Sequence, residues 1–223
     1  MILKKPALEA LTASIQIHQL NKMPNDPIKN FADLFSKLPS IGPRQATRLA
    51  FYIATLGKAK IKELAEVIDG LNRMGTCPNC FRTHQITTNK NLCAICADTK
   101  RNKDVIAVVE KETDLLSLER TKKFHGRYLV LGSLQKTGML DSEEKLRLNS
   151  LKKFIQKELN GKAKEIILAL NPTTYGDLNA AMLTNELKDY AEKITRLGRG
   201  IPTGGEIEFA DEETLESSLE KRS

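Results

Sequence analysis

Between Ile28 and Gly57 the apolar residues recur every three or four positions, a spacing that predicts two helices. The pattern is interrupted by Pro39-Ser40-Ile41-Gly42-Pro43, whose residues favour a tight turn. A further helix is expected from Ile61 to Met74, and Gly75 would end it. The apolar positions are Phe31, Leu34, Phe35, Leu38, Ala46, Leu49, Ala50 and Ile53 in the first two helices, and Leu64, Ala65, Ile68 and Leu71 in the third.

Residues 1–27 precede these helices and form an N-terminal extension. An amphipathic segment that favours a helix runs from Leu8 to Leu20. Pro24 and Pro27 follow it closely and would end the helix. The sequence assigns no function to this extension.

After residue 104 short apolar runs rich in β-branched residues alternate with helical segments. This alternation is typical of a mainly parallel sheet that is covered on both faces, and it predicts an α/β layer domain. Near the C-terminus, Glu206 to Phe209 alternates like a strand, and a helix is expected from Asp211. Strands are expected at Val105–Val109, Arg127–Leu131, Glu165–Leu170 and Lys193–Leu197, and helices at Thr113–Leu118, Ser142–Leu159 and Asp177–Ala191.

All four cysteines of the chain lie between these two regions, as Cys77, Cys80, Cys93 and Cys96. Two residues separate the members of each pair, and such short turns allow four sulfurs to converge on one tetrahedral ion. Four thiolates leave no position for water, so the ion would be structural, and zinc is the usual choice for tetrahedral sulfur. We therefore expect one structural zinc ion per chain.

Two disulfides or an iron–sulfur cluster are the alternatives for the four cysteines. Disulfides require an oxidising compartment, whereas Pro6 and Glu9 interrupt what would have to be a signal-peptide apolar region. No apolar run approaches the roughly 18 residues that a membrane span requires. We expect a cytoplasmic protein without a membrane segment, which favours the metal site.

The positive charge of the chain is concentrated in its first hundred residues. The whole chain carries a net charge of +7, and residues 1–100 hold 14 basic and 7 acidic residues, so they account for all of it. A localised positive surface attracts polyanions, of which nucleic acid is the commonest. Solvated surface lysines are the alternative explanation.

The turn at Pro39 to Pro43 resembles the helix-hairpin-helix DNA-binding motif. Ile41 and Gly42 match the motif, and Ser40 stands where its first glycine usually lies. Such a turn exposes backbone amides at the start of a helix, where they contact phosphate without reading bases. Together with Gly42, Arg44 and Arg48 are the candidate DNA contacts, and a plain helical hairpin is the alternative.

Ligands of open α/β sheets gather at the carboxyl ends of the strands. Glu110 follows the first expected strand and Asp114 lies one helical turn later, an arrangement that resembles the Toprim fold. In that fold a later Asp-x-Asp pair completes a magnesium site, but Asn171 and Thr173 stand at those positions here. The loss of two carboxylates should weaken magnesium binding severely. A divergent Toprim nuclease or primase using Glu110 and Asp177 is the alternative to an inactive scaffold.

The order of these features resembles the RecR family of bacterial recombination mediators, from about Ile28 to Arg222. The individual matches are short, but their order and spacing make the resemblance specific. The matching segments are Leu38-Pro39-Ser40-Ile41-Gly42-Pro43, Arg48-Leu49-Ala50-Phe51, the four-cysteine module, Val108-Val109-Glu110, Leu129-Val130-Leu131-Gly132, Gly198-Arg199-Gly200-Ile201-Pro202-Thr203-Gly204-Gly205-Glu206 and Ala210-Asp211-Glu212-Glu213-Thr214-Leu215.

The resemblance implies a non-enzymatic protein of recombinational DNA repair. Members of the family work with RecO, and in many bacteria with RecF, to help load RecA at single-strand gaps. It further implies a homo-oligomeric ring, built as a dimer of dimers, that binds DNA through phosphates with little sequence preference. Glu110 and Asp114 would then belong to the surface used for RecO or for contacts between subunits.

The expected fold class is mixed α/β, and the expected organisation has five regions. A purely protein-binding zinc adaptor is a third functional hypothesis beside the mediator and the Toprim enzyme. The regions are the extension at 1–27, a helix-hairpin-helix DNA-binding region at 28–75, a four-cysteine zinc finger at 76–103, a Toprim domain at 104–199 and a C-terminal strand-helix oligomerisation tail at 200–223.

Overall fold

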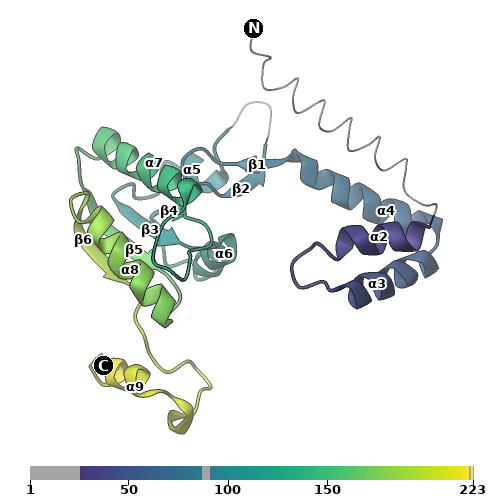
Figure 1. Ribbon diagram of the computed structural model, residues 1–223. Coiled ribbons are helices and arrows are strands. Elements are labelled where there is room, and N and C mark those ends of the chain that lie inside the picture. Colours follow the sequence, from purple (N-terminus) through teal and green to yellow (C-terminus); the bar gives the residue numbers. More distant parts are fainter. Residues whose placement is uncertain (1–25, 87–90, 221, 223) are drawn as a thin grey trace. The chain divides into compact units, whose positions relative to one another are not determined.

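The computed structural model describes residues 26–86, 91–220 and 222. The chain divides into two compact units, Met1–Asn72 and Arg73–Ser223. We refer to the described part of the first as the helical unit and to that of the second as the sheet unit (Figure 1). The helix expected at Leu8–Leu20 lies outside the described residues.

The helical unit contains the two expected helices of the hairpin, α2 (Pro27–Phe35) and α3 (Pro43–Thr55). The third helix is shorter than expected, because α4 (Lys58–Asp69) passes into a 3-10 turn, η1 (Gly70–Arg73). Asp26 caps α2 by accepting a hydrogen bond from the Ile28 amide at 3.0 Å. The rings of Phe31 and Phe35 stack on one another with centroids 3.8 Å apart.

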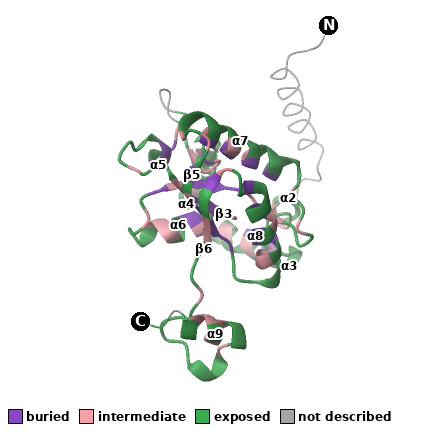
Figure 2. Cartoon of the chain, turned by 90° about the vertical axis from the view of Figure 1, so that its left-hand side faces the viewer, coloured by how far each residue is buried: buried purple, intermediate pink, exposed green. Residues whose placement is uncertain are grey.

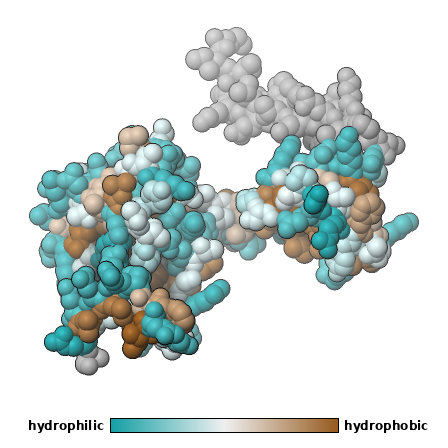
Figure 3. All heavy atoms as spheres, turned by 60° about the horizontal axis from the view of Figure 1, so that its bottom comes forward, coloured by the Kyte–Doolittle hydropathy of each residue, from teal (hydrophilic) through white to brown (hydrophobic). Residues whose placement is uncertain are grey.

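The core of the helical unit is small. Within its described residues, only Ala46 and Ala50 of α3 are buried, and α2 and α4 contribute no buried residue. Figure 3 shows apolar atoms at several places on the surface of this unit. The large apolar side chains that remain exposed are Leu34, Leu38, Phe51, Tyr52, Ile61, Val67, Ile68 and Leu71.

The sheet unit is built on four parallel strands in the order β4-β3-β5-β6, with a separate small hairpin. The mainly parallel sheet predicted from the sequence is therefore confirmed. Its elements are β1 (Met74–Thr76), β2 (Thr83–Gln85), α5 (Ala94–Ala97), β3 (Val105–Val109), α6 (Glu112–Arg120), β4 (Arg127–Val130), α7 (Ser142–Glu158), β5 (Ala163–Ala169), α8 (Thr174–Leu187), β6 (Ala191–Arg196), η2 (Ile207–Phe209) and α9 (Glu212–Glu220).

The two faces of the sheet are covered by different elements. Because side chains alternate along a strand, Ile106 and Val108 of β3 point into the core under α7 and α8. Ala107 and Val109 point to the opposite face, where they pack with the four cysteines and Leu115 of α6. The buried residues are concentrated on these central strands (Figure 2). The cysteine region is therefore part of one core layer of the sheet unit.

The cysteine region also closes one edge of the sheet. β4 is an edge strand, and its Val130 amide donates a hydrogen bond to the Cys80 carbonyl oxygen at 2.8 Å. Arg147 of α7 lies nearby, with a guanidinium nitrogen 3.0 Å from the Val130 carbonyl oxygen and its charge over the Phe81 ring. The outer side of β4 is thus bonded at this position.

The expected strand at Glu206–Phe209 is wrong, because this segment contains the 3-10 turn η2. A lone strand has no neighbour to satisfy its backbone groups, and here the Phe209 amide bonds to the Glu206 carbonyl oxygen instead. Ile207 and Phe209 are 69% and 79% exposed, so their alternation does not mark a buried face within this chain.

The boundary between α8 and β6 also differs from the expectation. The Thr173 hydroxyl caps α8 by accepting a hydrogen bond from the Gly176 amide, so the helix begins before Asp177. It ends at Leu187, and Ala191, expected to be helical, begins β6 and pairs with Ala163. None of the helices in the described ranges is long and apolar enough to cross a membrane.

Candidate metal centre and nucleic-acid interface

The four cysteines are positioned by two short turns. Cys77 directly follows β1, and its backbone bonds to Arg82 and Phe81 close the turn that contains Cys80. Phe81 adopts a left-handed conformation, with φ of 60°, which allows the chain to reverse sharply after Cys80. Cys93 is the N-cap residue of the one-turn helix α5, and Cys96 lies within this helix.

The structure brings Cys77, Cys80, Cys93 and Cys96 into one buried cluster, as the sequence predicts. All four sulfur atoms lie within 4.8 Å of one another, and the Sγ atoms of Cys80 and Cys93 are 3.5 Å apart. Four sulfurs at about 2.3 Å from a tetrahedral zinc ion would be separated by about 3.8 Å. The cluster therefore has the size that a zinc ion requires, and it contains no disulfide.

The electrostatics of the cluster also favour a cation at its centre. The pKa of the Cys77 thiol is lowered, chiefly because the Cys80 thiol donates a hydrogen bond to it. The same hydrogen bond raises the pKa of Cys80. The Cys77 thiolate is thus favoured only while the Cys80 thiol keeps its proton, and four buried thiolates together require a positive ion.

An ion-pair network that the sequence did not predict anchors the cysteine region to the sheet. Arg101, just after the last cysteine, forms a fork to Glu119 of α6, with nitrogen–oxygen distances of 2.9 and 2.5 Å. The Tyr128 hydroxyl donates to the same carboxylate at 2.8 Å. Burial raises the pKa of Glu119, but hydrogen bonds from Arg101 and Tyr128 outweigh burial and hold it below its usual value.

The turn before α3 presents a helix start that has no capping side chain. Gly42 is the N-cap residue, and its own amide donates to the Gln45 side-chain oxygen at 3.3 Å. Pro43 occupies the first helical position, where the missing N–H costs nothing. The next amides, those of Arg44 and Gln45, have no intrahelical acceptor and are available to an external anion.

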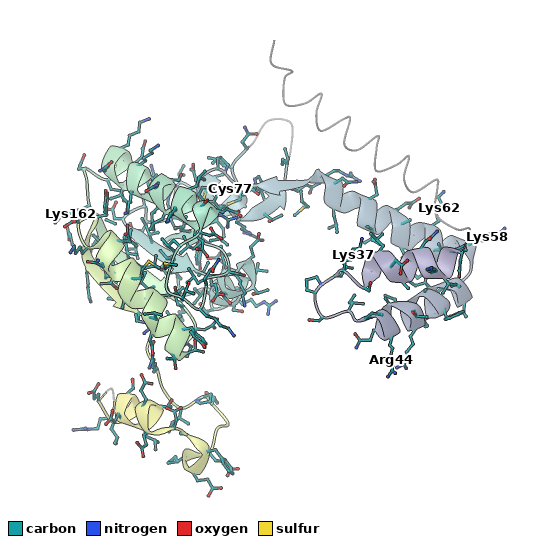
Figure 4. The ribbon with its side chains drawn as sticks, viewed as in Figure 1. Lys37, Arg44, Lys58, Lys62, Cys77 and Lys162 are labelled. Carbon is teal, nitrogen blue, oxygen red and sulfur yellow. The ribbon has the colours of Figure 1, made fainter. Side chains whose placement is uncertain are left out.

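Arg44 and Arg48 are both exposed on α3, one helical turn apart. Neither arginine forms a salt bridge to another described residue. Figure 4 shows Arg44 pointing outward from α3, below the helix in that view, and Lys37 beside the end of α2. Lys58 and Lys62 of α4 lie at the other end of this unit in that view.

At the carboxyl end of the sheet, Glu110 and Asn171 lie side by side. They follow the adjacent strands β3 and β5, and the Asn171 amide lies 3.4 Å from a Glu110 carboxylate oxygen. Asp114 caps α6, because its carboxylate accepts a hydrogen bond from the Lys111 amide at 2.9 Å. Glu110 lines a surface hollow of about 390 Å³, and Asp114 lines an adjoining one of about 480 Å³ that shares Leu170, Asn171 and Pro172 with it.

Asp177, the remaining carboxylate at this edge, is held by two arginines. Its side chain pairs with both Arg199 and Arg196, and these pairs lower its pKa. Among the described residues, the four cysteines form the only group of three or more metal-binding side chains. The structure therefore does not gather Glu110, Asp114 and Asp177 into a magnesium site.

Family models cover most of the chain in three consecutive matches. The model described as RecR, helix-hairpin-helix matches residues 28–71. A Toprim domain model matches residues 104–198, and the model described as RecR, C-terminal matches residues 200–223.

The chain is similar over most of its length to proteins named Recombination protein RecR. The protein from Anaeromyxobacter sp. (strain Fw109-5) is 41% identical over 199 residues, which are 88% of this chain and 96% of that protein. The protein from Acidothermus cellulolyticus is 37% identical over 196 residues, which are 87% of this chain and 95% of that protein. The protein from Syntrophomonas wolfei is 37% identical over 197 residues, 88% of this chain and 96% of that protein.

Proposed function

The chain belongs to the RecR family of recombination proteins, and from this premise we propose that it is a DNA-binding recombination mediator rather than an enzyme. The observation that carries the proposal is that Arg44 and Arg48, which form no salt bridge to any described residue, lie beside the open amides of α3. Both features favour phosphate oxygens, which carry no sequence information.

The α3 turn would bind a phosphate group in two ways. The amides of Arg44 and Gln45 point at the anion, and the positive end of the helix dipole stabilises it. The guanidinium groups of Arg44 and Arg48 then neutralise the same or the next phosphate along the strand. Binding of this kind depends strongly on salt and weakly on sequence.

The cysteine region supports this function by stabilising the fold. A bound zinc ion supplies the positive charge that keeps four sulfurs ionised in a dry core. Cys80 then holds the edge of the sheet, and the Arg101 fork holds the end of α6. Since thiolates persist in a reducing compartment, we place the protein in the cytoplasm.

The carboxyl edge of the sheet would serve protein contacts rather than phosphoryl transfer. Asn171 occupies the place of a metal-binding carboxylate and faces Glu110. We assign the surface around Glu110 and Asp114 to RecO or to a neighbouring subunit, with RecF as a further partner in the loading of RecA at gaps.

The chain would act as a homo-oligomeric ring, built as a dimer of dimers. The helical unit supports an assembly, since its apolar side chains on α3 and α4 are largely uncovered. The exposed Ile207 and Phe209 support a second contact through the C-terminal tail.

The first test is the salt dependence of DNA binding by the variant R44E/R48E. If the two arginines contact phosphate, the slope of log Kd against log salt falls by about 2 for each DNA-bound chain. K58E/K62E is the matched control, because it reverses two lysines that are also four residues apart at the start of a helix.

The control should bind a mixed-sequence oligonucleotide with the slope of the unsubstituted protein. Equal slopes for all three proteins would contradict the assignment of the α3 turn. Magnesium-dependent cleavage or synthesis of DNA that is lost in Glu110→Ala would contradict the non-enzymatic assignment.

A further inference from the structure

A second basic surface lies at the amino-terminal edge of the sheet, opposite the edge that holds Glu110. Two segments form it, residues 98–104 before β3 and residues 119–126 before β4. We call it the basic edge. Its cations are Lys100, Lys103, Arg120, Lys122 and Lys123, all exposed and none ion-paired to any residue that the structure describes.

Backbone and side-chain bonds hold the two segments together. The Asn102 amide donates to the His125 carbonyl oxygen at 2.9 Å, and Arg101 donates to the Gly126 carbonyl oxygen at 3.1 Å. The Arg101 guanidinium also neutralises Glu119, the acid nearest to the end of α6. The remaining five cations therefore lie on two segments that are bonded to one another.

The frame itself is tightly packed. A side chain at Gly126 would place its Cβ 2.4 Å from the Val105 carbonyl oxygen, so only glycine allows this turn to lie against β3. Next to it, the Phe124 ring packs edge-on against the Tyr128 ring, with centroids 4.9 Å apart. The segment that carries Lys122 and Lys123 is thus fixed at its C-terminal end.

Ordinary helix electrostatics does not explain this accumulation of charge. Cations near the C-terminus of a helix stabilise its dipole, but only Arg120 lies in the last turn of α6. Lys122 and Lys123 follow the helix, and Lys100 and Lys103 belong to the other segment. Besides Glu119, the two segments contain only two acids, Asp98, which lies 3.9 Å from Arg101, and Asp104, so the basic edge keeps a net positive charge.

The composition of the basic edge distinguishes between two kinds of polyanionic partner. Protein interfaces have an apolar centre, whereas nucleic-acid interfaces are polar and strongly positive. No large apolar side chain of the two segments is among the exposed ones. This composition favours a phosphate backbone over an acidic protein segment.

We propose that the basic edge is a second DNA-contacting surface, which binds phosphates through Lys100, Lys103, Lys122 and Lys123 in addition to the α3 turn. The proposal rests on the proposed DNA-binding function and assigns part of that function to the sheet unit. Since phosphates carry no sequence information, this surface would bind single-stranded or duplex DNA without base preference.

The test compares two double variants of the full-length, zinc-loaded protein, K122Q/K123Q and the control K145Q/K153Q. The control removes the same charge from two exposed lysines of α7. We expect K122Q/K123Q to weaken binding of a labelled mixed-sequence oligonucleotide by about tenfold at physiological salt. Its log–log salt slope should fall by about 2 per bound chain, while the control keeps the original slope.

A second variant, K100Q/K103Q, tests the other segment in case the first does not fold, and zinc content checks the integrity of each protein. If the unsubstituted protein shows no salt-dependent binding, the proposed function fails. If it binds DNA but both variants keep the slope of the control, the basic edge is not a DNA site. A change in native mass with an unchanged slope would identify a protein contact and would equally overturn the proposal.

Discussion

Ser40 adopts a backbone conformation that glycine adopts more readily. Its φ is 63°, in the left-handed region, where a side chain costs about 1 kcal/mol or more. The helix-hairpin-helix motif usually has glycine at this position, and the turn keeps its shape here without it. The open amides of Arg44 and Gln45 therefore do not depend on a glycine at position 40.

Replacing Ser40 with glycine should stabilise the helical unit. The relief of strain exceeds the added flexibility of the unfolded chain, so we expect a gain of up to about 1 kcal/mol. Hydrogen exchange of the α2 and α3 amides would measure it. Ser36→Gly is the control: Ser36 is right-handed, with φ of −65°, and its replacement should destabilise by about 0.5 kcal/mol. Equal effects of both substitutions on stability would show that the backbone at Ser40 is not strained.

Glu119 makes the stability of the sheet unit depend on pH. Its pKa is held below the usual value in the folded chain, so its contribution is complete above about pH 4.5 and is lost as the pH falls through the folded pKa. Arg101→Ala leaves the carboxylate largely buried, with Tyr128 as its remaining partner, and should cost about 2 kcal/mol at neutral pH.

The measurement is the urea midpoint of unfolding at several pH values. The loss of stability caused by Arg101→Ala should shrink as the pH falls below about 4.5, because protonation of Glu119 removes the charge that Arg101 neutralises. Lys100→Ala, one residue away and exposed, should have no such effect. A constant difference across this pH range would show that Arg101 acts by packing alone.

Among the elements, the cysteine region and the sheet depend on one another. Cys77, Cys80, Cys93 and Cys96 belong to the same buried cluster as Val109, Leu115 and Tyr128. Loss of the metal would therefore disturb one whole face of the sheet, and not only a surface loop.

Cys93→Ser tests this coupling. We expect the zinc content to fall from one ion per chain to near zero and the sheet unit to lose about 3 kcal/mol or more, about 10 °C in Tm. Metal analysis and thermal unfolding would measure the two effects. Ala94→Ser adds the same hydroxyl group at the next, exposed position and should retain zinc and stability. A metal-free variant with unchanged Tm would disprove the coupling.

The elements with strong local signals could be predicted from the sequence. The cysteine spacing fixes which side chains meet, and the β-branched runs mark β3 and β5 because both are buried on two faces. The segment at Glu206–Phe209 could not be predicted in this way. Its alternation is real, but strand formation depends on a neighbouring strand that the local pattern cannot reveal.

Contacts between residues far apart in the chain also could not be predicted from the sequence. Arg101 and Glu119, or Asp177 and Arg199, are far apart along the chain, and each is an ordinary charged residue by itself. The resemblance to the Toprim fold assigns Glu110 and Asp114 to one partner surface, but the sequence does not reveal that Asp114 also caps α6. The helix cap formed by Asp114 competes for its carboxylate, and this depends on where α6 begins.

At the scale of the whole molecule, the described residues of the helical unit bury little apolar surface. Val67, Ile68 and Leu71 in and after α4 are 66%, 55% and 65% exposed, and α4 has no buried residue. Exposed apolar surface of this extent supports the proposed contact with another protein chain. A second copy of the chain is the partner that the proposed ring supplies.

Val67→Asp should therefore lower the native mass. A charge in an apolar contact costs several kcal/mol, enough to dissociate subunits at micromolar concentration. Native mass spectrometry would compare the unsubstituted protein, Val67→Asp and the control Ala59→Asp, which adds the same charge to the first turn of α4. If the unsubstituted protein is a single chain, or if Val67→Asp keeps its mass, the assembly does not use this face.

The hydrogen bond from the Val130 amide to Cys80 has a consequence for handling the protein. Through this bond the turn that carries Cys80 covers the outer edge of β4. If the cysteines hold zinc as proposed, withdrawal of the ion would release that turn and leave an exposed β-edge, which is a template for pairing with other chains. Chelation is then a route to aggregates as well as to unfolding, and purification buffers should keep zinc and omit chelating agents.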